Sequence, residues 1–178
     1  ASTLSKSLAS VYITNSGTEA TEGALKLAKR ITNRSEIIAA KNSYHGNTQG
    51  AMSVSGVEKQ NAAFRPLIPD IRFIDFNNEF ELKYITDKTA AVILETIQGG
   101  AGFIQPINGY LTKVQERCNE VGALLILDEI QPGIGRTGKL FGFQNYNCIP
   151  DILVTGKGLG GGMPIGAFTA SSKLMSLL

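Results

Sequence analysis

The sequence predicts an α/β protein in which a mostly parallel sheet carries helices on both faces. Three observations lead to this prediction. Short apolar runs alternate with longer segments of helical periodicity, several runs are apolar throughout instead of alternating, and polar residues come directly after the runs. Strands that are buried on both faces of a parallel sheet have this character, and the helices between them cover the sheet.

Seven apolar runs are predicted to be strands. They cover residues 11–14, 37–40, 71–74, 91–94, 124–127, 152–154 and 165–168. Between the first two runs, apolar residues recur at helical spacing over 20–31, and Thr18 and Glu19 suit the start of a helix. The same spacing predicts a second helix over 110–120, between the fourth and fifth runs of the sequence.

The composition is that of an ordinary globular chain. Hydrophobic residues make up 43% and charged residues 18% of the 178 positions, which fits one domain or part of a larger protein. Lys and Arg number 17 against 15 Asp and Glu, and a net charge of +2 gives no strong field for nucleic acid or anionic lipid. No apolar stretch approaches the roughly 20 residues that a membrane helix needs. We therefore expect neither nucleic acid nor a membrane as a partner.

The cysteines and the chain ends bear on where the protein occurs. Cys118 and Cys148 make neither a disulfide framework nor a metal-spaced cluster, so we expect a cytoplasmic protein without a bound metal. The first ten residues contain no apolar segment of a secretory signal. The chain does not begin with Met, and residues 171–178 end in the middle of an apolar pattern. We therefore expect it to be part of a longer protein.

Polar residues gather where the predicted strands end. Ser16-Gly17-Thr18 follows the first run, residues 42–46 follow the second, Glu95 follows the fourth, residues 128–131 follow the fifth and Lys157 follows the sixth. Ligands of open α/β sheets bind outside the carboxyl ends of the strands. The five polar sites are therefore predicted to meet in one crevice.

Two kinds of nucleotide site are disfavoured. The strand that ends in Asp128-Glu129 resembles the acidic strand of nucleotide hydrolases, and residues 133–139 match G-x-x-x-x-G-K, but Leu140 stands where a Ser or Thr must reach the metal. Two G-x-G-x-x-G matches, over 133–138 and 156–161, open no readable helix. The second match also lacks the acidic residue of a dinucleotide site, since no Asp or Glu follows Asp151.

Each remaining motif has an ordinary structural interpretation when it is taken alone. Residues 15–20 could be a simple helix cap, Lys157 a solvated loop lysine, Tyr44 a packing residue and His45 a local hydrogen-bonding residue. Together, a phosphate-sized anion site, an aromatic platform, a carboxylate at a strand end and an amine that can form a Schiff base are what pyridoxal phosphate requires.

With these residues in view, the chain resembles the large domain of the class III, ornithine- and acetylornithine-aminotransferase-like, pyridoxal-phosphate enzymes of fold type I. The resemblance runs from about residue 11 to the C-terminus and rests on six motifs in family order. These are Asn15-Ser16-Gly17-Thr18-Glu19-Ala20, Tyr44-His45-Gly46, Glu95-Thr96-Ile97-Gln98-Gly99, Asp128-Glu129-Ile130-Gln131, Gly135-Arg136-Thr137-Gly138 and Gly156-Lys157-Gly158-Leu159-Gly160-Gly161-Gly162.

The resemblance implies roles for the residues of the first two motifs. Gly17 and Thr18 would hold the cofactor phosphate, with Ser16 beside them in the cofactor site. Tyr44 would stack on one face of the ring, and His45 would belong to the same cofactor-binding set.

The later motifs would supply the catalytic groups. Asp128 would pair with the pyridine nitrogen, Gln131 would contact the ring hydroxyl and Ile130 would pack against the second ring face. Lys157 would form the Schiff base and then move a proton between the substrate α-carbon and the cofactor. Glu95 would lie near the cofactor and the substrate.

The implied function is transamination between an amino donor and an oxo acid, in a homodimer with the active site at the interface. Residues 1–178 would be the cofactor-binding large domain, without the N-terminal segment and C-terminal small domain of the family. Two alternatives stay open: another pyridoxal-phosphate reaction on the same fold, such as decarboxylation or an aminomutase reaction, and a catalytically incomplete cofactor-binding fragment.

Two positions depart from the ornithine-type pattern. Asn47 stands where ornithine and acetylornithine aminotransferases have an Arg that receives a substrate carboxylate, and Gly100 replaces a Glu that can neutralise a second Arg. Both changes remove charged groups that select carboxylates. The donor is therefore left open among ω-amino compounds, amino sugars and semialdehydes of the glutamate-1-semialdehyde kind.

Overall fold

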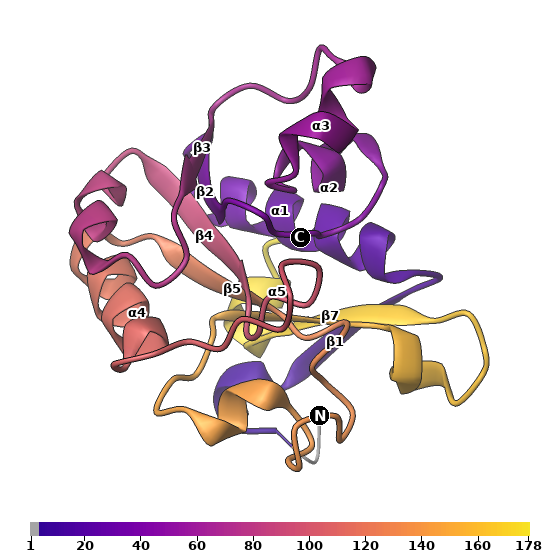
Figure 1. The fold of residues 1–178 in the computed structure, drawn as a ribbon. Helices are drawn as coiled ribbons and strands as arrows, with labels where there is room; N and C mark the ends of the chain where they lie inside the picture. The colour runs from indigo at the N-terminus through magenta and orange to yellow at the C-terminus, as the bar shows by residue number, and fades with distance from the viewer. Residues whose placement is uncertain (1–3) are drawn as a thin grey trace.

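The computed structural model describes residues 4–178 as a seven-stranded sheet with helices on both faces (Figure 1). All seven predicted runs form strands, which confirms the α/β class. The strands are β1 (Ser10–Thr14), β2 (Glu36–Ala40), β3 (Ile71–Ile74), β4 (Thr89–Glu95), β5 (Leu124–Asp128), β6 (Ile152–Thr155) and β7 (Gly166–Ala170).

The strand order is β1-β7-β6-β5-β4-β2-β3, and most neighbours are parallel. Strands β3, β2, β4, β5 and β6 run in one direction. Strand β7 runs against both of its neighbours, β6 and β1. The prediction of a mostly parallel sheet is therefore confirmed, and the reversed strand lies between the parallel block and the edge strand β1.

Both predicted helices are present. They are α1 (Gly17–Thr32) and α4 (Tyr110–Val121). Three shorter helices were not predicted: α2 (Gln49–Ser53), α3 (Glu58–Asn61) and α5 (Ser172–Met175). Single 3-10 turns lie at Lys6–Leu8, Ala62–Phe64, Glu79–Tyr84, Gly142–Asn145 and Lys157–Gly160. The short helices contain too few residues to show a periodic apolar face, which is why periodicity missed them.

Local sequence fixes both ends of α1. The Ser16 hydroxyl caps the helix by accepting the amide of Glu19 at 3.3 Å, and the Glu19 carboxylate accepts the amide of Asn15 at 2.7 Å. The first bond satisfies an amide that a helix start leaves without a partner, and the second ties the residue before the cap to the first turn. Asn33 ends the helix in the left-handed conformation, at φ 53°.

Alternate residues of the central strands are buried in two separate hydrophobic cores, one on each face of the sheet. On β2, Ile38 points into the core beneath α4 and Ile37 into the core beneath α1, because successive side chains of a strand face opposite sides. Figure 1 shows α1 and α4 on opposite sides of the sheet. The buried contributors of the helices are Ala20, Ala24, Leu25, Leu27 and Ala28 from α1, and Tyr110, Leu111, Val114 and Cys118 from α4.

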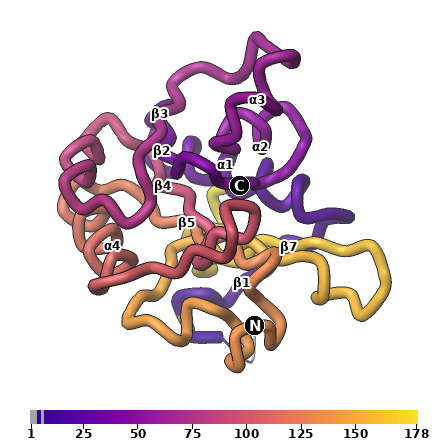
Figure 2. Tube along the Cα trace, in the orientation of Figure 1, coloured from indigo at the N-terminus to yellow at the C-terminus, as the bar shows by residue number. Residues whose placement is uncertain are grey.

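The beginning of the described chain packs under the sheet with a later segment. Leu8 is fully buried in the α4-side core together with Phe141 and Phe143. Figure 2 shows the N-terminal segment and the orange segment around residue 140 together at the lower end of the molecule. Within residues 4–178, no helix is both long enough and apolar enough to cross a membrane.

Candidate functional site

The carboxyl ends of the strands surround a cavity of about 290 Å³. All the predicted site residues except Ser16 line it. The lining consists of Gly17, Thr18, Tyr44, His45, Gly46, Asn47, Glu95, Asp128, Ile130, Gln131, Pro132 and Lys157. The structure thus brings together the residues that follow β1, β2, β4, β5 and β6.

The start of α1 forms one wall of the cavity. Gly17 is packed so tightly that a Cβ there would lie 2.7 Å from Cδ1 of Ile130, so only glycine fits without a shift. Ser16 stands just outside the lining, with its hydroxyl used as the helix cap. The first amides of an α-helix have no carbonyl partner within the helix and carry positive partial charge. This wall can therefore bind an anion.

A hydrogen-bond network that the sequence analysis missed holds this wall. Thr18 Oγ1 lies 2.7 Å from Thr48 Oγ1 and accepts the Thr48 amide at 3.2 Å. The Glu22 carboxylate accepts the Thr48 hydroxyl at 2.6 Å and the amides of Gly50 and Ala51, which begin α2. Glu22 thereby ties α2 to α1. No local sequence signal reveals a carboxylate on one helix that caps another.

Asp128 and His45 form a buried pair at the cavity. His45 Nδ1 lies 2.7 Å from Asp128 Oδ2, and Asp128 Oδ1 accepts the amide of Ile130 at 2.9 Å. Both side chains are almost fully inaccessible to solvent. With Asp128 ionised, Nδ1 carries the ring proton and donates it. His45 Nε2 is buried without a hydrogen-bond partner among residues 4–178.

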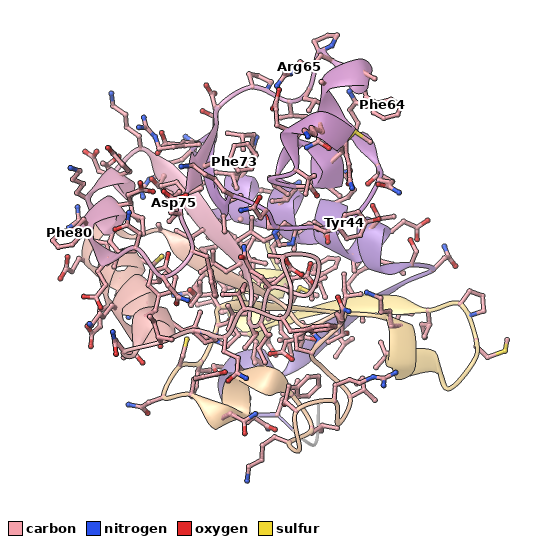
Figure 3. The ribbon with its side chains drawn as sticks, in the orientation of Figure 1. Tyr44, Phe64, Arg65, Phe73, Asp75 and Phe80 are labelled. Carbon is pink, nitrogen blue, oxygen red and sulfur yellow. The ribbon has the colours of Figure 1, made fainter. Side chains whose placement is uncertain are left out.

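Glu95 lies beside Asp128, because the two residues are register partners at the ends of β4 and β5. Its carboxylate accepts the amides of Tyr44 and Gly99, each at 3.1 Å. Burial is the main reason that the pKa of Glu95 is raised above its ordinary value. Glu95 therefore fixes the backbone of the segment that carries Tyr44, whose side chain is 42% exposed and lies beside α1 in Figure 3.

Lys157 follows β6 and stands at the border of two cavities. It begins the 3-10 turn Lys157–Gly160 with a left-handed backbone, at φ 45°. Besides the first cavity, it lines a second one of about 930 Å³, and the two cavities share Lys157, Ile130, Gln131 and Pro132. An amine at this border can reach a group bound in either space.

Glu129 is a second structural residue that the sequence analysis did not single out. It is fully buried, and its carboxylate accepts the Thr96 hydroxyl at 2.5 Å and the amides of Gly142 and Phe143 at 2.7 Å. Burial raises its pKa as well. These bonds anchor both ends of the loop 130–141, which lines both cavities. The sequence shows the acidic pair 128–129, but it does not show that the two residues have different roles.

Comparison with known proteins places the chain in a family. The family model described as aminotransferase class-III matches residues 2–178. A [LysW]-aminoadipate semialdehyde/glutamate semialdehyde transaminase of Sulfurisphaera tokodaii is 48% identical over 88% of this chain. The chain spans 41% of the length of that relative.

Solved structures agree with this placement. The ornithine aminotransferase of Toxoplasma gondii matches 94% of this chain and 42% of its own with a TM-score of 0.89 at 35% identity. The taurine:2-oxoglutarate aminotransferase of Bifidobacterium kashiwanohense, solved with PLP and glutamate, matches 93% of this chain and 43% of its own with a TM-score of 0.85 at 31% identity. Because the family model covers nearly the whole chain, the chain belongs to the class-III aminotransferases.

Proposed function

We propose that the protein is a pyridoxal-phosphate-dependent aminotransferase that moves an amino group from an amino donor to an oxo acid. The observation that carries the proposal is the meeting of three groups at one cavity: the start of α1, the buried carboxylate of Asp128 and the amine of Lys157. The named relatives support it, because they are called transaminases or aminotransferases and one of them was solved with PLP and glutamate.

The start of α1 fits the phosphate of this cofactor. Helix α1 has 16 residues, and its N-terminal amides attract an anion. Gly17 presents no side chain that would block the approach of a phosphate oxygen. Because the Thr18 hydroxyl already bonds to Thr48, we expect Thr18 to contact the phosphate through its backbone amide.

The residues around the cavity also fit the ring. A carboxylate has about four lone-pair positions, and Asp128 uses two of them for His45 and the Ile130 amide, so it can still accept a bond from the ring nitrogen. His45 would orient Asp128 through the hydrogen bond between them. Tyr44 and Ile130 would contact the two ring faces.

Gln131 and Glu95 complete the proposed cofactor site. A Cβ on Gly99 would lie 2.1 Å from Gln131 Oε1, so the Gln131 amide group lies against Gly99 beside the cavity. We expect this amide to contact the ring hydroxyl. Glu95 would act through the Tyr44 and Gly99 amides that it already accepts.

Lys157 would carry the proton transfers. Pyridoxal phosphate, when bound, supplies an electron sink for the negative charge that develops beside the substrate nitrogen. The Lys157 amine would hold the cofactor until an amino donor displaces it. In the first half of the exchange, its Nζ would then take a proton from the donor α-carbon. In the second half, it would deliver a proton to the α-carbon of the oxo acid that is being converted. The border position of Lys157 suits both tasks, because the donor can enter through the larger cavity.

We also propose a cytoplasmic homodimer with the site near the subunit interface. Phe103, at the larger cavity, is 69% exposed, and Met163, in the loop between Lys157 and β7, is 72% exposed, which suits surfaces that a second subunit covers. The two cysteines are free and buried, as expected in a reducing compartment. Sedimentation of the full-length protein tests the dimer.

The proposal is tested on the full-length protein by visible absorption with added pyridoxal phosphate. We expect a protein-dependent band that bleaches when an amino donor is added and returns with an oxo acid. Lys157→Ala should abolish the band and the cofactor attachment that borohydride traps, whereas Lys139→Ala, at an exposed lysine, should preserve both.

The outcome also separates the related reactions. A panel of donors, with ornithine and ω-amino acids included, identifies the substrate by the oxo acid and amino acid that accumulate. Release of CO₂ without amino transfer would identify a decarboxylase instead. Trapped cofactor that persists in Lys157→Ala would overturn the assignment of this lysine.

A further inference from the structure

Ile134 has a backbone conformation that its side chain opposes. Its φ is 55°, in the left-handed region that β-branched residues rarely adopt. Such strain persists only where the surroundings fix the residue, and it gathers at functional sites. Ile134 is half-buried, packs against the α4-side core and lines the larger cavity.

The Ile134 side chain lies over the turn that carries Lys157. A Cβ on Gly158 would meet Cβ of Ile134 at 3.5 Å, which is an ordinary contact distance. On the other side of the lysine, a Cβ on Gly156 would meet Cγ2 of Ile130 at 3.4 Å. Two isoleucines of one loop therefore bracket the two glycines that flank Lys157.

The direction of the Lys157 side chain depends on this turn. Lys157 has a left-handed backbone, and its exposed side chain makes no hydrogen bond or ion pair to any residue that the structure describes. The turn itself is closed by the Leu159 amide, which donates to the Gly156 carbonyl at 3.0 Å. The Gly161 amide also donates to the Gly158 carbonyl at 3.3 Å, and the turn packs against Gly17 and Ile165 as well as against the two isoleucines. Ile134 is therefore one of several contacts that hold the turn in place.

The loop that carries both isoleucines is itself anchored. The Gly133 amide donates to the Glu129 carbonyl at 3.0 Å, and the Gly135 amide donates to the Leu140 carbonyl at 3.1 Å. A Cβ on Gly133 would lie 2.4 Å from the Glu129 carbonyl oxygen, so the chain turns as tightly as glycine allows. The support for Ile134 therefore extends back to the buried end of β5.

We propose that Ile134 is a positioning residue that packs over Gly158 and, together with the other contacts of the turn, directs the Lys157 amine toward the border between the two cavities. This inference rests on the proposed function of Lys157. It assigns no contact with cofactor or substrate to Ile134, which acts through the backbone of the turn. Loss of the contact should let the Lys157 amine move away from its productive position. A misplacement by about 1 Å can lower the rate of the chemical step by a large factor.

The test uses three variants of the full-length protein, loaded with pyridoxal phosphate. Ile134→Ala and Ile134→Gly should both lower the rate constant of the first half-reaction about tenfold while KM for the amino donor changes less than about twofold. Ile134→Val, which keeps the branch at Cβ, should restore the rate to within about twofold of the unmodified protein. Glycine relieves the strain at φ 55° and alanine does not, so the Gly variant should be the more stable of the two.

A second measurement needs no cofactor. Hydrogen exchange of the Leu159 amide reports on the turn directly, and we expect it to quicken in the Ala and Gly variants. Asn33→Ala, at a left-handed residue that ends α1, is the control: it should lower stability and change neither the half-reaction rate nor the Leu159 exchange.

The two proposals fail in different ways. If the unmodified protein binds no pyridoxal phosphate but Leu159 exchange responds as expected, the proposed function fails and the bracing of the turn stands. If the Ala and Gly variants keep the full half-reaction rate, or if the rates follow stability instead of the loss of the side chain, the positioning role of Ile134 is overturned.

Discussion

Helices α1 and α4 contribute to stability in the same way, but they contribute differently to the functional site. Each lays an apolar face on one side of the sheet and buries residues from the same central strands. They differ at their first turns. Helix α1 opens on the cavity with Gly17 pressed against Ile130, whereas α4 begins with Tyr110, which is buried in the core behind a left-handed Gly109.

The difference shows that, in this layered α/β fold, the buried face of a helix contributes to stability while its first turn can contribute to the functional site. The middle segments of the two helices have the same role, because each covers one face of the sheet with an apolar stripe. Both helices follow a strand that ends at the crevice, but only residues 15–16 separate β1 from α1, whereas residues 96–109 separate β4 from α4. A first turn becomes functional where it directly follows such a strand end.

The largest effect should come from the buried apolar faces of the helices, and it should be the same for both. Leu27→Ala in α1 and Leu111→Ala in α4 each remove a fully buried side chain, and each should lower the free energy of unfolding by about 3 kcal/mol. Denaturant unfolding measures both. Cofactor affinity, compared under folded conditions, should change in neither variant. A selective loss of affinity in Leu27→Ala would mean that the body of α1 also tunes the site.

The first turns should respond differently to the same substitution. Gly17→Ala places a Cβ 2.7 Å from Ile130 Cδ1, and we expect the dissociation constant for pyridoxal phosphate to rise at least about tenfold because the wall must shift. Gly109→Ala meets no atom within 4 Å but strains a backbone at φ 70°, so it should cost about 1 kcal/mol of stability and leave affinity unchanged. Titration monitored by absorbance compares the two. Equal affinities would remove the distinction between the first turns.

A smaller effect should come from the cap of α1. Ser16→Ala removes the bond to the Glu19 amide and should lower the free energy of unfolding by about 1 kcal/mol. Because the hydroxyl is used inside the helix and Ser16 lies outside the cavity lining, cofactor affinity should fall less than about twofold. A larger fall in affinity would instead place this hydroxyl on the phosphate.

The smallest effect concerns the pH dependence of stability. Burial raises the pKa of Glu95 above its ordinary value of 4.5, so the folded protein holds this proton more tightly than the unfolded chain does. The resulting stabilisation is complete below the unfolded pKa and is lost as the pH rises through the folded pKa. Glu95→Gln lacks this dependence.

The measurement is denaturant unfolding of both proteins at several pH values from the acidic range to neutrality. The free energy of unfolding of the unmodified protein, taken relative to Glu95→Gln, should decline with rising pH and then level off. Other buried carboxylates such as Glu129 contribute to both proteins and cancel in the difference. Parallel curves would contradict the link between burial and the Glu95 proton.

The sequence predicts most of the sheet and the set of residues at its edge, and the reasons are local. Runs such as residues 91–94 are apolar throughout because the strand is buried on both faces, and Glu95 directly follows such a run. The meeting of these strand ends follows from parallel geometry alone. Side chains could therefore be assigned to one crevice before any contact was known.

Long-range pairings could not be predicted in the same way. The bond between His45 and Asp128, the cap that Glu22 provides for α2 and the anchoring of Glu129 each join segments that are far apart in the chain. Their partners are set by strand order, and strand order leaves no trace in periodicity. The reversed direction of β7 could not be predicted for the same reason, because an apolar run has the same pattern in a parallel and in an antiparallel strand.

The placement of β7 has a consequence for how the protein is made. Strand β1 pairs only with β7 in the sheet of residues 4–178, and β7 is the last of these seven strands to leave the ribosome. The segment with Gly17 is synthesised before the central strands, but the strand before it has no place in the sheet until β7 arrives between it and β6. Completion of the crevice therefore waits until all seven strands are made, and a chain that stops before residue 166 would keep its central strands while leaving β1 undocked.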